Sequence, residues 1–342
     1  MTIRSLLIAN RGEIAVRIIR AAQELGIRCV AIYPQDDASS LHTQLADDRV
    51  PLRGRGVSAY LDARQIVRLA RATGCDAIHP GYGFLAENAE FAAATLAADL
   101  QFVGPRPATL ALFGNKLSAR KLAQDCAVPL LAGTNSATTL EQAQAFFAAL
   151  KPNDAMMIKA VAGGGGRGMR IVRNARDVAP AFEQCQAEAE LGFGNPAVFI
   201  ETYLPAARHI EVQIVGDGER VVHLFERECS LQRRHQKLIE IAPSPTLAPA
   251  MREKLFAAAT KMAVAGRYSG LGTFEFLVDA TAPTQRFVFL EANARLQVEH
   301  TVTEEVTGVD LVQTQLQIAG GMSLEQLGLA DNQRFAPVGH AI

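Results

Sequence analysis

The chain has 342 residues, of which 49% are hydrophobic and 20% charged, and its formal net charge is −1. A chain of this composition can bury a sizeable core in roughly two or three compact units, and its charge gives no long-range field for nucleic acid or anionic lipid. Five scattered cysteines without a C-x-x-C spacing argue against a disulfide framework or structural zinc, and no apolar run is long enough for a signal or membrane segment, so we expect a soluble, cytoplasmic protein.

The N-terminal part of the sequence alternates short apolar runs with helical patterns. Strands are expected at residues 5–10, 28–34, 76–80 and 101–104, and helices at 12–25, 63–72 and 90–100. This alternation predicts a parallel sheet in an α/β domain. Ligands of such sheets bind beyond the carboxyl ends of strands, where NRGEIA (10–15) and HPGYGFLAEN (79–88) fall. The first of these lacks the glycine fingerprint, which argues against a dinucleotide.

The order of elements changes after GPRP (104–107), so the domain boundary is expected between Gly104 and Gly114. Helices are then expected at 116–125, 140–150, 176–191 and 249–265, with another beginning near Val309. Strands are expected at 155–160, 169–172, 197–204, 272–279 and 286–297, and a hairpin at 209–228 around Gly216-Asp217-Gly218. The second part is therefore predicted to be α+β with an antiparallel sheet.

The segment AGGGGRGMRIV (162–172) is the most unusual stretch of the sequence. Gly163, Gly165 and Gly168 satisfy G-x-G-x-x-G, but a strand and not a helix follows, and Met169 stands where a Walker motif needs lysine. Two interpretations stay open: a flexible surface hairpin, or a flap over nucleotide phosphates with Lys159 on the entering strand.

A row of polar groups marks two of the expected strands. Period-2 alternation places Phe274 and Phe276 on one face and Glu275 on the other. If the extended conformation persists, one further face carries Glu291, Asn293, Arg295, Gln297 and Glu299. Neighbouring carboxylates and an amide are suited to Mg²⁺, and a solvated charged face is the alternative.

The segment ERECSLQRRHQKLIE (226–240) concentrates basic side chains in a near-neutral protein. It carries Arg227, Arg233, Arg234, His235 and Lys237. Such density indicates an anion-binding loop, with a solvated loop as the alternative. The lysine before a glycine flap, the strand carboxylates and this cationic segment together describe an ATP-dependent ligase better than a kinase, because H-R-D-x-x-x-x-N and D-F-G motifs are lacking.

Long segments of the chain closely resemble biotin carboxylase, the ATP-grasp component of biotin-dependent carboxylases. The similarity runs in order from residue 3 to the C-terminus, in segments 8–27, 79–92, 114–116, 159–172, 230–237 and 291–312. It implies a Rossmann-like pre-ATP-grasp α/β domain over residues 1–113 and an α+β ATP-grasp domain over 114–342, with a lid at about 130–204. The implied reaction is carboxylation of biotin N1′ by bicarbonate, with ATP and Mg²⁺ (or Mn²⁺), through carboxyphosphate.

The resemblance also implies a nucleotide site. Lys116 and Lys159 match lysines that hold ATP phosphates, and the glycine flap closes over them. Glu201 and Leu204 match the hinge that reads adenine, where Thr202 replaces a lysine that the family often has. The expected ATP-binding residues are Lys116, Lys159, Gly163, Gly164, Gly165, Gly166, Gly168, Glu201, Leu204, His209 and His235.

The same resemblance assigns the remaining groups. Glu275 and Glu291 match the metal ligands, with Asn293 beside them. The bicarbonate site is expected at Arg295, Gln297 and Val298. Glu299 matches the general base, Lys237 the cation that stabilises carboxyphosphate, and Arg295 the third catalytic residue. Tyr82 and Gly83 match the biotin-side loop.

The family pattern continues past this sequence. GHAI (339–342) resembles the start of a strand that leads, in the family, to an arginine at the biotin site and a C-terminal domain. We therefore expect an N-terminal fragment that retains the ATP site and carboxylates free biotin poorly. No carrier lysine in an A-M-K-M-like context is present, so a biotin carrier domain and a carboxyltransferase domain or subunit are the expected partners, in a homo-oligomeric full enzyme.

Segment 296–312 looks more like multidomain pyruvate or long acyl-CoA carboxylases than the free-standing bacterial subunit. Two other functions stay open. One is a nucleotide-binding fragment without catalysis. The other is an ATP-grasp ligase of the carbamoyl-phosphate synthetase type, which shares the carboxyphosphate step.

Overall fold

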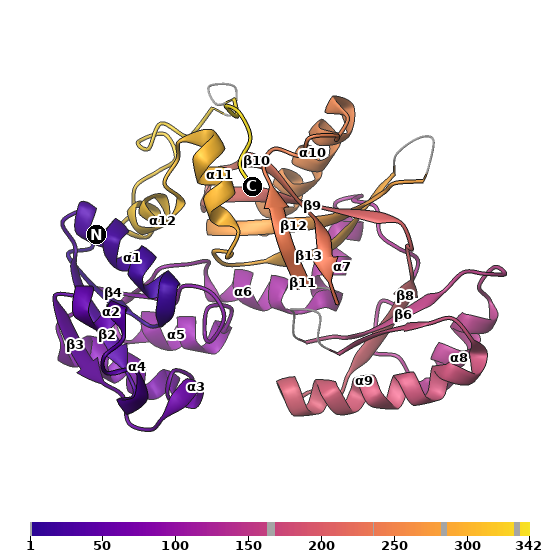
Figure 1. The fold of residues 1–342 in the computed structure, drawn as a ribbon, viewed down its shortest axis with the longest axis horizontal. Coiled ribbons are helices and arrows are strands. Elements are labelled where there is room, and N and C mark those ends of the chain that lie inside the picture. The colour runs from indigo at the N-terminus through magenta and orange to yellow at the C-terminus, as the bar shows by residue number, and fades with distance from the viewer. Residues whose placement is uncertain (1, 163–167, 235, 282–285, 332–335) are drawn as a thin grey trace.

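The computed structural model describes residues 2–162, 168–234, 236–281, 286–331 and 336–342. Within these ranges the chain forms a five-stranded parallel sheet, a five-stranded antiparallel sheet and a three-stranded antiparallel sheet. Figure 1 shows an elongated molecule, with the parallel sheet at one end, the three-stranded sheet at the other and the five-stranded antiparallel sheet between them. No helix in the described ranges is both long and apolar enough to cross a membrane.

The N-terminal sheet has the strand order β3-β2-β1-β4-β5, and its strands are parallel. They are β1 (Ser5–Ile8), β2 (Arg28–Tyr33), β3 (Asp48–Pro51), β4 (Ala77–His79) and β5 (Gln101–Phe102). The helices around them are α1 (Gly12–Glu24), α2 (Leu41–Leu45), α3 (Gly56–Ala59), α4 (Ala63–Ala72) and α5 (Ala89–Ala97), with a 3-10 turn at Gln35–Asp37. All four residues of β1 are buried, as expected of a parallel strand with both faces covered. The predicted α/β unit is confirmed, although β3, α2 and α3 were not predicted.

The central sheet is antiparallel, in the order β11-β10-β9-β12-β13. Its strands are β9 (Ala207–Asp217), β10 (Val221–Arg233), β11 (Gln236–Ile241), β12 (Ser269–Asp279) and β13 (Phe287–Asn293). The helices that accompany it are α10 (Pro249–Ala265), α11 (His300–Thr307) and α12 (Leu311–Ala319). Phe274 and Phe276 are fully buried in the aromatic core while Glu275 lines the cavity on the opposite side, which confirms the predicted alternation in β12.

The structure corrects three expectations for this region. The predicted cationic loop at 226–240 is wrong, because β10 continues to Arg233 and β11 begins at Gln236. The turn of the β9–β10 hairpin lies at 218–220, so Gly216 and Asp217 belong to β9. The extended conformation of β13 ends at Asn293 and does not persist to Glu299.

The three-stranded sheet, called the lid sheet below, has the order β7-β6-β8. It consists of β6 (Met156–Ala160), β7 (Met169–Val172) and β8 (Val198–Thr202). Helices α8 (Leu140–Ala148) and α9 (Val178–Phe193) pack on one of its faces around Ile158 and Phe182, with a 3-10 turn at Ala175–Asp177 leading into α9. This leaves the other face of the lid sheet turned toward the central sheet (Figure 1).

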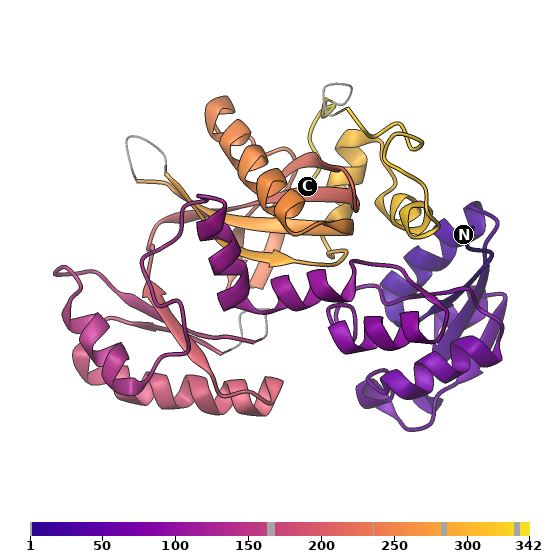
Figure 2. The same cartoon turned by 180° about the vertical axis from the view of Figure 1, so that it is seen from behind.

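Two consecutive helices, α6 (Pro107–Gly114) and α7 (Lys116–Asp125), connect the three sheets. Figure 2 shows them running along the central sheet from the N-terminal unit toward the lid sheet. One continuous buried cluster includes Leu7 and Ile78 of the parallel sheet, Phe113 of α6 and Phe274 of the central sheet. The proposed domain boundary at residue 113 thus crosses a shared core and stays a prediction.

Candidate functional site

A cavity of about 600 Å³ lies between the lid sheet and the central sheet. Many of the residues expected from the sequence line it: Lys116, Lys159, Glu201, Leu204, His209, Lys237, Glu275, Glu291, Asn293, Arg295, Gln297, Val298 and Glu299. They come from α7, from both antiparallel sheets, from the segment between β8 and β9 and from the segment after β13. Residues more than 180 positions apart in sequence therefore share one site (Lys116 and Glu299).

Some predicted site residues fall elsewhere. Gly163, Gly164, Gly165, Gly166 and His235 lie outside the described residues. Gly168 precedes β7, and its carbonyl accepts a 2.8 Å hydrogen bond from the Ala160 N–H. Tyr82 and Gly83 are not among the cavity-lining residues of the described chain.

Three glutamates lie side by side across the central sheet. Glu275 of β12 is paired in register with Glu211 of β9 on one side and with Glu291 of β13 on the other. Glu211 was not predicted as a site residue, although alternation places it on the same face as His209. Glu275 and Glu291 of this row line the cavity, whereas Glu211 is fully buried beside them.

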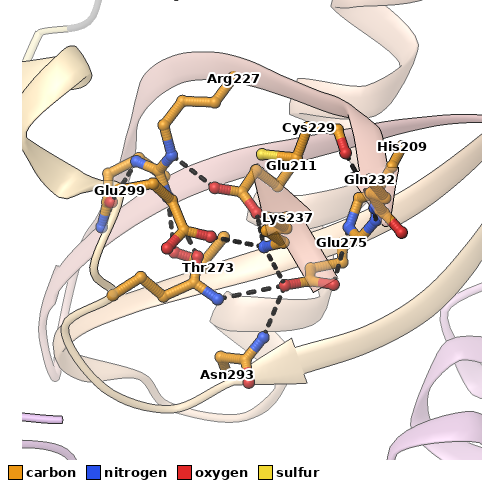
Figure 3. A network of polar contacts seen from close by, with 12 residues as sticks. His209, Glu211, Arg227, Cys229, Gln232, Lys237, Thr273, Glu275, Asn293 and Glu299 are labelled. Atoms are coloured by element: carbon orange, nitrogen blue, oxygen red, sulfur yellow. Dashed lines mark hydrogen bonds and ion pairs between the residues drawn. The ribbon is translucent and has the colours of Figure 1, made fainter. Parts of the chain in front are cut away.

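Lys237 is the centre of this arrangement (Figure 3). Its Nζ lies 2.5 Å from Glu211 Oε2, 2.9 Å from Glu275 Oε1 and 2.5 Å from Glu299 Oε1. Burial disfavours the ammonium charge, but the three carboxylates outweigh that effect and raise the pKa of Lys237. Burial likewise opposes the charges of Glu211 and Glu275, and the neighbouring cations nevertheless lower the pKa of both carboxyl groups. The site is therefore a charged cluster in which one lysine is shared by three carboxylates.

Glu275 is also held by three other side chains. His209 Nε2 lies 2.8 Å from its Oε2, while Asn293 Nδ2 and Gln297 Nε2 donate to its Oε1 at 2.8 and 3.1 Å. Burial would lower the pKa of His209, but the Glu275 carboxylate raises it. Both oxygens of Glu275 are thus engaged by groups on four different segments.

Arg227 lies next to Glu211 in this cluster (Figure 3) and is completely buried. The sequence placed it in the expected anion-binding loop, whereas it is an interior residue of β10. Burial disfavours its charge, but Glu211 and Glu299 raise its pKa. Its Nε donates to Glu211 Oε1 at 2.5 Å, so Glu211 lies between a buried arginine and Lys237.

Arg295 joins the N-terminal unit to the site. Its Nε donates to Glu87 Oε2 at 2.9 Å, and its NH2 group donates to Asn293 Oδ1 at 3.0 Å. Burial opposes the charge, but Glu87 and more distant glutamates raise the pKa of Arg295. Glu87 belongs to the HPGYGFLAEN segment. That segment does not line the cavity, but through Glu87 it contacts Arg295, which does.

The lid carries a second buried charge cluster. Glu201 forms ion pairs with Lys159 and, at 2.9 Å, with Arg120 NH1 of α7, and these three side chains are at most 8% exposed. The sequence predicted a backbone role for Glu201 at the adenine hinge, and it gave no signal for Arg120. Glu201 and Lys159 both line the cavity, and the Glu201 carboxylate holds the Lys159 ammonium group in place there.

The donor set at the floor of the cavity fits Mg²⁺ or Mn²⁺. Glu275 and Glu291 are adjacent carboxylates, and Asn293 adds an amide oxygen. Glu291 Oε2 lies 3.6 Å from Lys116 Nζ, and the Glu291 side chain is 25% exposed to the cavity. Hard oxygen donors beside two lysines are the combination that a metal-bound phosphate chain needs.

Comparisons with known proteins agree with this arrangement. Residues 2–110 match the family described as biotin carboxylase, N-terminal domain, and residues 115–327 match carbamoyl-phosphate synthase L chain, ATP binding domain. Pyruvate carboxylases from Aspergillus terreus and Bacillus subtilis are 47% and 45% identical over 348 residues. These matches cover all of this chain and 29% and 30% of the relatives.

Solved structures give the same result. The biotin carboxylase domain dimer of Hydrogenobacter thermophilus 2-oxoglutarate carboxylase, in complex with MgADP, ADP and bicarbonate, has a TM-score of 0.94 and 39% identity. Biotin carboxylase from Campylobacter jejuni, in a β,γ-ATP complex, has a TM-score of 0.93 and 38% identity. Each comparison covers 99% of this chain and 74% of the other.

This fold and this site define an ATP-grasp ligase. Within that class, the chain belongs to the biotin carboxylase family, as the biotin carboxylase domain of a biotin-dependent carboxylase. It spans less than a third of the length of the curated pyruvate carboxylases that it matches.

Proposed function

We propose that this chain uses ATP and bicarbonate to carboxylate biotin through carboxyphosphate. The observation that carries the proposal is the contact of Lys237 with Glu299 at 2.5 Å, in the cavity that also holds Arg295 and Gln297. The solved biotin carboxylase domain of Hydrogenobacter thermophilus 2-oxoglutarate carboxylase is in complex with MgADP, ADP and bicarbonate, and this cavity offers groups suited to all three. Nucleotide, metal and bicarbonate are therefore assigned to one site.

We assign the nucleotide phosphates to Lys116 and Lys159, because both lysines line the cavity from opposite units. Glu275, Glu291 and Asn293 would hold Mg²⁺ or Mn²⁺, which neutralises phosphate charge when bound. Leu204 and the β8 end supply the apolar wall and backbone for adenine, with His209 nearby. The segment 163–168 is the proposed flap over the phosphates.

We assign bicarbonate to Arg295 and Gln297, with Val298 beside them. Bicarbonate is a weak nucleophile, so its attack on the γ-phosphorus requires loss of its proton, and the Glu299 carboxylate accepts that proton. The new oxygen–phosphorus bond forms as the bond to ADP breaks, and the product is carboxyphosphate. We assign to Lys237, whose Nζ lies 2.5 Å from Glu299 Oε1, the stabilisation of the negative charge of that intermediate.

The biotin side is proposed at the Tyr82–Gly83 loop. This loop is fixed at the end of β4, because Asn10 Nδ2 donates to Tyr82 O at 2.8 Å and the Tyr82 hydroxyl bonds to Glu13. Biotin would arrive on a carrier domain, and a carboxyltransferase would use the carboxybiotin, in a homo-oligomeric enzyme. Relatives named as pyruvate, 2-oxoglutarate and long-chain acyl-CoA carboxylases share this domain, so the shared half-reaction is the activity we propose.

The test is phosphate release from MgATP with and without bicarbonate, together with ¹⁴C-bicarbonate fixation on biotin. The Glu299→Gln variant should lose about 100-fold or more of the bicarbonate-dependent rate and retain nucleotide binding. Glu305→Gln, at an exposed position of α11, is the matched control and should behave as the unaltered chain. ATP cleavage that ignores bicarbonate would overturn the proposal, and stimulation by ammonia in place of biotin would favour a carbamoyl-phosphate synthetase type.

A further inference from the structure

Arg227 uses every N–H group of its guanidinium. The Nε group donates to Glu211, the NH1 group to Gln213 and Thr303, and the NH2 group to Thr273 and Gln297. The acceptors come from β9, β12, α11 and the segment after β13. A guanidinium has five donors and no acceptor, so this set satisfies it completely.

One of these bonds reaches the proposed bicarbonate site. Gln297 Oε1 accepts from Arg227 NH2 at 3.3 Å, and Gln297 Nε2 donates to Glu275 Oε1 at 3.1 Å. Arg227 cannot accept a hydrogen bond, and an ionised carboxylate cannot donate one. The orientation of the Gln297 amide is therefore fixed from both sides, with its oxygen toward Arg227 and its nitrogen toward the cavity floor.

We propose that Arg227 is a positioning residue that presents Gln297 to bicarbonate as a hydrogen-bond donor. This inference rests on the proposed function. In this arrangement the anionic oxygens of bicarbonate bind toward Arg295 and Gln297, and its hydroxyl group turns toward Glu299. A reversed amide would offer a carbonyl oxygen to the hydroxyl group and would compete with Glu299 for the proton.

Arg227 acts through other residues and does not itself line the cavity. Through Nε it also fixes Glu211 Oε1, while Glu211 Oε2 contacts Lys237. The same guanidinium thus supports the groups on two sides of the bicarbonate site, Gln297 on one and Lys237 on the other. This double contact explains why a full charge is buried at this position without direct contact to substrate.

The variant Arg227→Lys tests the inference, because lysine keeps the charge and loses the planar fork. We expect the KM for bicarbonate in ATP cleavage to rise about tenfold, as for loss of one hydrogen bond to a charged group, with the KM for ATP within about twofold. Arg252→Lys is the matched control. Arg252 pairs with Glu226 at 2.7 Å, next to Arg227 in sequence but away from Gln297.

A merely structural role would reduce the yield of active protein and leave the KM for bicarbonate unchanged. A folded Arg227→Lys chain with an unchanged KM for bicarbonate would therefore overturn the inference. If that chain does not fold, the Thr273→Val variant tests the inference instead. The Arg227 NH2 group donates to Thr273 Oγ1 at 3.1 Å and also donates to Gln297. We expect Thr273→Val to raise the KM about threefold and Thr303→Val, on the NH1 group, to leave it unchanged.

The same experiment separates the two proposals. An unaltered chain without bicarbonate-dependent phosphate release contradicts the proposed function. An unaltered chain that shows this activity, with an unchanged KM in Thr273→Val or in folded Arg227→Lys, contradicts only the role of Arg227.

Discussion

Glu275 and Glu291 are direct cross-strand partners, yet their carboxylates are held in different ways. Glu275 is 4% exposed and contacts Lys237 at 2.9 Å and His209 at 2.8 Å, whereas Glu291 is 25% exposed and lies 3.6 Å from Lys116. The Glu275 carboxylate is part of the buried charge cluster. The Glu291 carboxylate faces the cavity and has more freedom to bind a metal ion.

We therefore expect Glu275→Gln and Glu291→Gln to differ in stability. Glu275→Gln removes a buried carboxylate that the Lys237 ammonium group and His209 both contact, and it should lower the free energy of unfolding by about 3 kcal/mol. Glu291→Gln should change it by less than about 1 kcal/mol but raise the Mg²⁺ concentration needed for half-maximal ATP cleavage. Urea denaturation without nucleotide measures the first effect, and equal stability losses in the two variants would contradict this distinction.

Glu201 should be essential for the stability of the lid sheet. Glu201→Ala leaves Arg120 and Lys159 buried without their shared carboxylate, and we expect a loss of about 3 kcal/mol. Glu188→Ala is the control, because Glu188 is 46% exposed in its ion pair with Arg170 and should cost less than about 1 kcal/mol. The comparison is made by urea denaturation, and a mild effect of Glu201→Ala would show that the buried cluster contributes little.

His223 should make stability depend on pH below neutrality. It stacks on Phe256 with ring centroids 4.0 Å apart, and burial lowers its pKa to about 4. In the unfolded chain His223 takes up a proton near pH 6.5, whereas in the folded chain it does not. The contribution of neutral His223 to stability is therefore fully present above pH 6.5 and decreases toward pH 4.

The His223→Phe variant keeps a ring at this position. Between pH 7.5 and pH 5, its free energy of unfolding should fall by about 2 kcal/mol less than that of the unaltered chain. Free energies of unfolding measured at pH 7.5, 6 and 5 give the slope. The control His340→Gln, at an exposed position, should retain the slope of the unaltered chain. An unchanged slope in His223→Phe would show that His223 does not titrate as its burial implies.

Gly133 should tolerate no side chain, because a Cβ atom there would lie 2.4 Å from the Ile200 carbonyl oxygen. Gly133 forms a bridge with Glu201, so Gly133→Ala should displace β8 and lower stability by about 2 kcal/mol or more. Gly192→Ala in α9 meets no atom within 4 Å and should stabilise the chain by about 0.5–1 kcal/mol. Thermal denaturation of the pair checks both signs, and a neutral Gly133→Ala would contradict the close approach.

The alternation of β12 was predictable because strand side chains point to opposite faces whatever the neighbouring strands do. It correctly placed Phe274 in the core and Glu275 opposite. The same reasoning failed at Arg227, because charge density around it indicated a surface loop. Burial of that charge depends on acceptors from four other segments, and β10 also has register shifts beyond Glu228 that break simple alternation.

Glu87 and Arg120 show a second limit of sequence patterns. Each is a common charged residue in a helical or loop context, with no local feature that sets it apart. Their importance comes from partners far away in sequence, Arg295 for Glu87 and Glu201 for Arg120. Such pairs are visible only when the units are packed together.

The buried cluster that joins the parallel sheet, α6 and the central sheet limits how segments of this protein can be exchanged with those of a relative. Leu7, Phe113 and Phe274 belong to one core, although their elements differ in type. A chimera that exchanges only residues 1–113 with a relative would place foreign apolar surfaces against each other. A successful exchange has to transfer α6 together with the matching face of β12, so the N-terminal unit is inherited with its partner and not as an independent module.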